Sequence, residues 1–167
     1  MKDIRINQMD EKYDLFDRLE TDRLELVPRM SYRRANELLE EIQKDDLLPN
    51  FNLLNVSCSD FVEEFRLGID RYSVFCRQNY TEINLVGLVA LDVDDKDNSC
   101  SIGYYILPKY RRKGFAFEIV SKVIDELKGK TIKANTLKDN ERSISLLKKL
   151  DFEFVEEKDG NVFFQKK

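Results

Sequence analysis

The chain has 167 residues, of which 42% are hydrophobic and 36% are charged, and its formal net charge is −4. This composition predicts one folded domain of ordinary size, since a disordered chain carries too little apolar surface to bury. The net negative charge argues against nucleic-acid binding, because proteins that bind nucleic acids usually present a basic face. No apolar run approaches membrane-spanning length, and the N-terminus lacks the apolar core of a signal peptide. We therefore expect a cytoplasmic protein with no membrane partner.

The chain contains no histidine, which excludes Ser-His-Asp and Cys-His catalysis and histidine-ligated zinc. Its cysteines, Cys58, Cys76 and Cys100, are scattered and lack the spacing of a metal site. We expect them to behave as small hydrophobic residues in a reducing compartment, and we expect no metal cofactor.

Residues 1–20 are predicted to form an extension ahead of a single domain over residues 21–167. A short amphipathic helix is expected in this extension, with apolar residues at Tyr13, Leu15, Phe16 and Leu19. The extension covers either an edge of the domain or a partner subunit, which leaves a homodimer open. The domain itself is predicted to begin with a strand over Thr21–Pro28, because apolar and polar residues alternate from Leu24.

Two helices are predicted next. Ser31 can cap the first helix, whose apolar positions recur with helical spacing at Ala35, Leu38, Leu39 and Ile42. A loop over Leu47–Ser57 follows. Asp60 and Glu63 then form the pattern of a capping box for the second helix, with Phe61, Phe65 and Ile69 facing inward.

A run of strands leads to the central part of the chain. Strands are predicted over Tyr72–Gln78 and Ile83–Val93, and the polar residues Asp94–Asn98 form a hairpin into a central strand over Ser101–Leu107. Pro108 ends this strand because proline has no N–H to donate. A helix follows, with apolar residues spaced 3.6 apart at Phe115, Ala116, Ile119, Val120, Val123, Ile124 and Leu127.

The turn between the central strand and this helix has the properties of an anion site. It contains the cations Arg111, Arg112 and Lys113 and then Gly114, which allows a ligand to approach the backbone closely. The first N–H groups of a helix have no intrahelical partner, and the helix dipole favours anions there. A pyrophosphate would fit. The sequence is neither a Walker loop nor a dinucleotide fingerprint, since the additional glycines of both motifs are missing.

The last third of the chain completes the fold. A strand is predicted over Thr131–Leu137, a helix from Lys138 to Leu150, and two strands, Phe152–Glu156 and Val162–Gln165, joined by an Asp-Gly turn. The central strand, its helix and the next strand form a right-handed parallel crossover, whereas the other pairings are antiparallel. The expected fold is α/β (α+β), with a mixed, mostly antiparallel central sheet and helices on both faces.

Three motifs resemble those of one family, and they occur in the family's order. R-x-x-G-x-A at Arg111–Ala116, after a strand ending in Y-Y-I-L-P, resembles the cofactor motif of the GNAT superfamily of acyl-CoA-dependent N-acyltransferases. T-x-R-L-x-L from Thr21, the N-x-x-S-x-x-x-L-x-K-x-x-F pattern from Asn140 to Phe152, and Glu118 are similar to the branch that includes ribosomal-protein N-terminal acetyltransferases. The resemblance implies a GNAT-like domain that uses acetyl-CoA as cosubstrate.

The resemblance also implies roles for individual residues. Acetyl-CoA would donate its acetyl group directly to a primary amine, either a protein N-terminus or a small molecule. Ser143 is the implied catalytic residue, as proton donor to the leaving thiolate. The implied cofactor-binding residues are Ile106, Leu107, Arg111, Arg112, Lys113, Gly114, Phe115, Ala116 and Asn140. Main-chain groups of Ile106 and Leu107 would pair with the pantetheine arm, with one N–H donating to the oxyanion, and Asn140 would also bind that arm.

Three departures from the family pattern bear on catalysis. Many members protonate the thiolate with a tyrosine at the position of Leu147, so Ser143 is the natural substitute, although it can equally cap its helix. A glutamate that the branch often carries is replaced by Ser101, which leaves the base open among Asp92, Tyr104, Tyr105 and water. The usual glycine before Phe152 is Asp151, a residue type that tolerates a left-handed backbone.

Two alternative functions remain open from the sequence. The first is a catalytically weak GNAT-fold module that binds acyl-CoA and acts as a regulator, since the base is unassigned. The second, which we favour least, is RNA binding through Arg111–Lys113, which would show a steep salt dependence. Release of free CoA in the presence of amines distinguishes an enzyme from the binding module.

Overall fold

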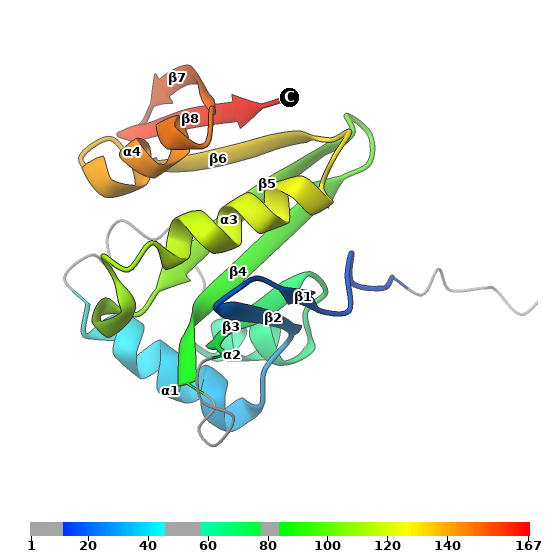
Figure 1. Cartoon of the computed structure of the whole chain (residues 1–167), viewed down its shortest axis with the longest axis vertical. Helices are drawn as coiled ribbons and strands as arrows, with labels where there is room; N and C mark the ends of the chain where they lie inside the picture. Colours follow the sequence, from blue (N-terminus) through cyan, green and yellow to red (C-terminus); the bar gives the residue numbers. More distant parts are fainter. Residues whose placement is uncertain (1–11, 46–57, 78–83) are drawn as a thin grey trace, which may run out of the picture.

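The computed structural model describes residues 12–45, 58–77 and 84–167, which fold around one eight-stranded sheet (Figure 1). The strand order is β1-β2-β3-β4-β5-β6-β8-β7, and every pairing is antiparallel except that of β5 with β6. The strands are β1 (Leu19–Glu20), β2 (Leu24–Pro28), β3 (Arg71–Cys76), β4 (Asn84–Asp94), β5 (Ser99–Ile106), β6 (Thr131–Leu137), β7 (Glu153–Lys158) and β8 (Asn161–Lys166). The predicted mixed, mostly antiparallel sheet is confirmed.

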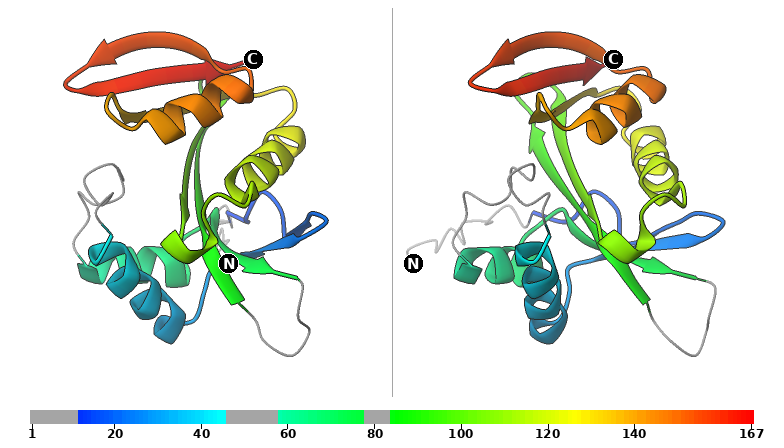
Figure 2. Two further views of the ribbon diagram at one scale, coloured as in Figure 1. Left: turned by 60° about the vertical axis from the view of Figure 1, so that its left-hand side comes forward. Right: turned by 90° about the vertical axis from the view of Figure 1, so that its left-hand side faces the viewer.

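Helices cover both faces of the sheet (Figure 2). They are α1 (Tyr32–Gln43), α2 (Cys58–Leu67), α3 (Phe115–Glu126) and α4 (Glu141–Lys149), with a short 3-10 helix, η3 (Pro108–Tyr110). The buried side chains form two clusters, one between the sheet and α1 and α2, the other between the sheet and α3 and α4. Side chains alternate along β5 and so contribute to both clusters. Ile106 belongs to the cluster beside α3 and α4, and Tyr105 to the cluster beside α1 and α2.

The start of the chain differs from the prediction. No helix forms over residues 12–20; instead Leu19–Glu20 adds an edge strand to β2. The Phe16 ring stacks on Tyr72 with centroids 4.6 Å apart, and the Leu15 N–H donates to Asp70 at 2.7 Å. The helix was wrongly expected because only Phe16 and Leu19 pack against the sheet, while Tyr13 and Leu15 are exposed, and backbone groups of the segment find tertiary partners instead of helical ones.

The first two helices follow their apolar patterns. Ser31 caps α1 as expected, since its side chain accepts from the Arg34 N–H at 3.4 Å. The capping box expected at Asp60 is wrong: α2 begins at Cys58, so Asp60 lies in its first turn, where a carboxylate also suits the helix dipole. The loop predicted over residues 47–57 lies outside the described residues.

The two parallel strands of the sheet separate along their length (Figure 1). Their pairing begins at Ser99 with Thr131 and ends at Ser101 with Lys133. Beyond that point β5 stays paired with β4 as far as Ile106, and β6 stays paired with β8 as far as Leu137. Among the described strands, none therefore pairs with the main chain of β5 on this side over residues 102–106.

Asp151 adopts the left-handed conformation expected of it, with φ = 60°. Because this conformation strains a residue with a Cβ, we expect Asp151→Gly to raise the free energy of unfolding by about 0.5 kcal/mol. Urea denaturation measures the change. Asp139→Gly is the matched control: Asp139 does not have positive φ, and this variant should lose stability. A loss of stability in Asp151→Gly would contradict this account.

Candidate active site

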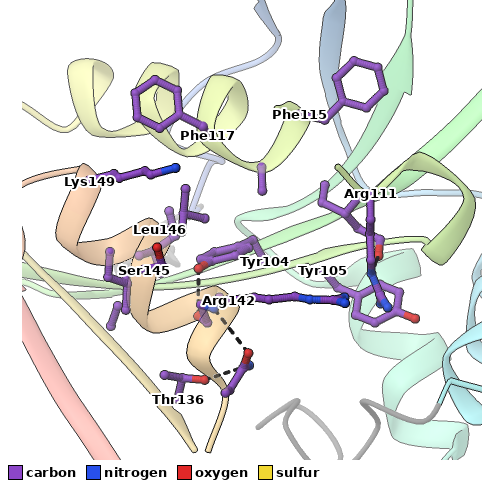
Figure 3. Close-up of a pocket in the computed structure, with 18 of the residues that line it drawn as sticks. Tyr104, Tyr105, Arg111, Phe115, Phe117, Thr136, Arg142, Ser145, Leu146 and Lys149 are labelled. Atoms are coloured by element: carbon purple, nitrogen blue, oxygen red, sulfur yellow. Dashed lines mark hydrogen bonds between the residues drawn. The ribbon is translucent and has the colours of Figure 1, made fainter. Parts of the chain in front are cut away.

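A cavity of about 1040 Å³ occupies the gap between the diverging strands (Figure 3). It is lined by residues 102–106 of β5, residues 134–136 of β6, the loop and first turn of α3, and one side of α4. Its size is at the upper end of the range of small-molecule sites. An extended ligand arm lying in the gap would take the place of a strand beside β5.

The direction of each backbone group along β5 follows from one hydrogen bond. The Leu107 N–H donates to the Val86 carbonyl at 2.8 Å, so it faces β4. Because backbone groups alternate along a strand, the N–H groups of Ile106 and Tyr104 face the opposite side, into the gap. The expected pairing of a cofactor with the Leu107 amide is therefore wrong, since that amide already has a partner and Leu107 does not line the cavity. The Ile106 amide lies on the gap side of β5, so we still expect it to pair with a cofactor.

The N-terminus of α3 places amides that have no partner among the described residues beside the same cavity. Gly114 is the N-cap with φ = 78°, and no side chain of the described residues caps it. The first intrahelical bond runs from the Glu118 N–H to the Gly114 carbonyl at 3.0 Å, so the amides of Phe115 to Phe117 lie ahead of it. A left-handed residue followed by a helical one turns successive N–H groups toward a common point, which is an anion-binding arrangement.

The cations of this loop have different roles. Arg111 lines the cavity, but its guanidinium is bound by the Asp45 carboxylate and donates from Nε to the Ile106 carbonyl at 2.9 Å. Lys113 does not line the cavity, and its Nζ lies 5.6 Å from the centroid of the Tyr110 ring. Arg112 is exposed at the cavity with φ = 61°. Arg111 therefore secures the loop to the end of α1, and the sequence did not reveal this because Asp45 is 66 positions away.

Asn140 and Ser143 belong to one hydrogen-bonded chain at the start of α4. Asn140 caps the helix by accepting from the Ser143 N–H at 3.2 Å, and its Nδ2 donates to Thr136 Oγ1 at 3.0 Å. The Ser143 hydroxyl does not cap; it lies 2.9 Å from the Tyr104 hydroxyl. The second N–H of the Asn140 amide has no acceptor within the described part of the chain, so it can bind a ligand.

The tyrosines on β5 keep their protons at neutral pH. Burial raises the pKa of Tyr104, opposed by the hydrogen bond to Ser143. Burial and the neighbouring Asp45 raise the pKa of Tyr105. Both hydroxyls are therefore protonated at neutral pH, which argues against either as the base. Asp92 is bonded to Arg71 at 2.9 Å and pairs with Ser101, far along β5 from Ile106. Glu141 is the only carboxylate among the described residues that line the cavity.

The Glu118 carboxylate is held in the first turn of α3. Arg23 donates to it from Nε at 2.7 Å and from its backbone N–H at 3.0 Å, and the Thr21 hydroxyl also donates to it. Burial acts to raise the pKa of Glu118, but the hydrogen bonds from Thr21 and Arg23 outweigh it and hold the pKa below its ordinary value.

This arrangement predicts a pH-dependent contribution to stability. A carboxylate whose pKa is lowered in the folded state stabilises the fold at pH values above the ordinary glutamate pKa of about 4.3. This contribution is lost as the pH falls through the pKa of the folded state. We therefore expect Glu118→Gln to lower the free energy of unfolding at neutral pH, with a difference from wild type that shrinks in acid. Urea denaturation across this pH range measures it, with Glu126→Gln as the exposed control on the same helix. A difference independent of pH would contradict the prediction.

Within the described residues, no cluster of histidine, cysteine, aspartate or glutamate side chains is suited to hold a metal ion. Across the same part of the chain, none of the helices combines the length and apolar character needed to span a membrane.

The family of the chain follows from its sequence as well as its fold. Residues 38–153 match the family model for the acetyltransferase (GNAT) domain. This match covers more than half of the chain, so the protein belongs to the GNAT acetyltransferase family and is an acetyltransferase. Family members use acetyl-CoA.

Individual relatives agree with this assignment. The chain is 29% identical over 153 residues to the uncharacterized N-acetyltransferase YoaA of Bacillus subtilis, covering 83% of this chain and 84% of the relative. A GNAT acetyltransferase of Bacillus anthracis has a similar fold, with a TM-score of 0.74 at 16% identity, over 89% of this chain and 97% of that one. The ribosomal L7/L12 α-N-protein acetyltransferase RimL in complex with CoA gives a TM-score of 0.68 at 13% identity, over 87% and 94%.

Proposed function

We propose that this protein transfers the acetyl group of acetyl-CoA to a primary amine by direct attack of the amine on the thioester. The observation that carries the proposal is the convergence of three features on one cavity. These are the amides at the start of α3 and the open side of β5, neither of which has a partner among the described residues, and the Tyr104–Ser143 hydroxyl pair. A catalytic site for this reaction needs a binding site for the diphosphate, a hydrogen-bond donor to the developing oxyanion, and a proton donor to the leaving thiolate.

Each feature has a distinct role in the proposal. The amides from Gly114 to Phe117 bind the diphosphate of acetyl-CoA, with Arg112 adding positive potential. The pantetheine arm lies beside β5 and Asn140, and it brings an activated acyl group to Ile106. The Ile106 N–H then donates to the carbonyl oxygen as negative charge develops on it.

The proton transfers complete the reaction. As the amine nitrogen bonds to the acyl carbon and the carbon–sulfur bond breaks, Ser143 donates its hydroxyl proton to the sulfur and is reprotonated by water in the cavity. In this proposal Tyr104 is the donor in its 2.9 Å hydrogen bond with Ser143 Oγ, which directs the serine proton away from Tyr104 and toward the gap. We assign removal of the amine proton to Glu141, directly or through water, because it is the only carboxylate among the described lining residues.

Turnover against a panel of amines tests the proposal. Acetyl-CoA is incubated with the protein and with polyamines, amino acids or peptides bearing free N-termini, and released thiol is measured. We expect release that depends on both the protein and one class of amine. A protein that binds acetyl-CoA but releases no thiol with any member of the panel would contradict the proposal and favour an acyl-CoA-binding module.

A further inference from the structure

Arg23 joins the start of β2 to the loop that precedes α3. Its Nη1 donates to the carbonyl oxygen of Lys113 at 2.8 Å, across 90 positions of sequence. Its Nε donates to Oε2 of Glu118 at 2.7 Å, and the guanidinium lies 4.5 Å from the centroid of the Phe115 ring. A planar guanidinium carries its donors on a rigid fork, so these groups are held in one fixed arrangement.

The bond to Lys113 sets the direction of the Gly114 amide. The Lys113 carbonyl and the Gly114 N–H belong to the same planar trans peptide, so they point in opposite directions. Holding the carbonyl toward Arg23 therefore aims the Gly114 N–H away from Arg23. Gly114 lines the cavity, and an amide oriented before the ligand arrives binds it at a lower entropic cost.

Arg23 also neutralises a charge that would oppose an anionic ligand. Glu118 lies in the first turn of α3, where its carboxylate would repel a diphosphate at the same helix end. Arg23 and Thr21 donate to both of its oxygens, so the carboxylate is occupied on the side of β2. The pair adds little net charge to the site.

We propose that Arg23 is a positioning residue for the diphosphate of acetyl-CoA, acting by orienting the Gly114 amide and by neutralising Glu118. The inference rests on the proposed function, because it assumes that the diphosphate binds at the start of α3. It gives the T-x-R-L-x-L segment from Thr21 a role at the cofactor loop and not only in the edge of the sheet.

Calorimetric titration with CoA, at a temperature where every variant is folded, separates the two effects. Arg23→Lys keeps the charge, but one ammonium group cannot hold both Glu118 and the Lys113 carbonyl in place. We expect it to weaken CoA binding roughly tenfold. Arg23→Gln also leaves Glu118 uncompensated, which should weaken binding by roughly another tenfold. The double variant Arg23→Gln, Glu118→Gln should return to the affinity of Arg23→Lys.

Lys122→Gln is the matched control, because it removes the partner of Glu126 in an exposed ion pair on the same helix. It should bind CoA as the wild type does. Wild-type affinity in Arg23→Lys, or a double variant that binds no more tightly than Arg23→Gln, would overturn the inference, because a purely structural brace predicts no recovery. Absence of CoA binding by the wild type would instead refute the proposed function.

Discussion

Replacing Gly114 with glutamate is expected to weaken CoA binding by at least about a hundredfold. The nearest atom to a Cβ at this position is Arg23 Nη2 at 3.5 Å, so space is not the obstacle. The obstacles are the φ of 78°, which a residue with a side chain adopts only under strain, and a carboxylate placed where we expect the diphosphate. Calorimetric titration with CoA measures the loss.

Gly129 offers a close control for this substitution. It lies just beyond the other end of α3 with φ = 88°, and apart from its chain neighbours no atom of the described residues lies within 4 Å of a Cβ built there. Gly129→Glu therefore imposes similar backbone strain far from the proposed ligand, and it should bind CoA with the wild-type affinity. Equal losses in the two variants would mean that the effect comes from strain in α3 and not from the anion site.

Replacing Ser143 with alanine is expected to lower kcat by roughly a hundredfold or more, with little change in the KM for acetyl-CoA. The hydroxyl is proposed to act only as the carbon–sulfur bond breaks, so its loss affects the transition state and not binding. Tyr104→Phe should lower kcat less, by roughly tenfold, because the serine proton remains but is no longer directed toward the gap. Steady-state kinetics with the best amine of the panel measures both.

The two hydroxyls are expected to act as a unit. The double variant Ser143→Ala, Tyr104→Phe should therefore be no slower than Ser143→Ala alone. Tyr72→Phe is the control for loss of a buried tyrosine hydroxyl: Tyr72 lies on β3, away from the cavity, and donates to Asp70. Independent, multiplying losses in the double variant would contradict a shared role, and an unchanged kcat in Ser143→Ala would remove Ser143 from the mechanism.

The fold could be predicted because its elements have clear local signals. Apolar spacing located α1 and α3, and Pro108 and Gly114 marked the end of β5 and the start of α3. Even the departure at Asp151 was correctly read, since its backbone is left-handed as expected. The prediction of a helix over residues 13–19 was wrong because the same apolar spacing also fits an extended segment packed on a sheet. Only the tertiary partners of the segment decide between the two.

The site could be predicted only to the level of its motifs. The register with β4 decides which amides of β5 face the gap. The sequence does not give this register, so the amide of Leu107 was expected in the gap although it faces β4. The contacts from Tyr104 to Ser143 and from Arg111 to Asp45 join residues 39 and 66 positions apart. No local pattern encodes such pairs; the β5–β6 crossover and the end of α1 bring them together.

The most direct test of the account is a titration of the isotope-labelled protein with CoA and with pantetheine, followed through its amide NMR signals. We predict that CoA shifts the amides of Gly114 to Phe117 together with that of Ile106, because the diphosphate and the arm occupy their sites at once. Pantetheine, which lacks the diphosphate, should shift Ile106 and leave the start of α3 unchanged. CoA binding that leaves the amides of Gly114 to Phe117 unshifted would contradict the central claim that the start of α3 holds the diphosphate.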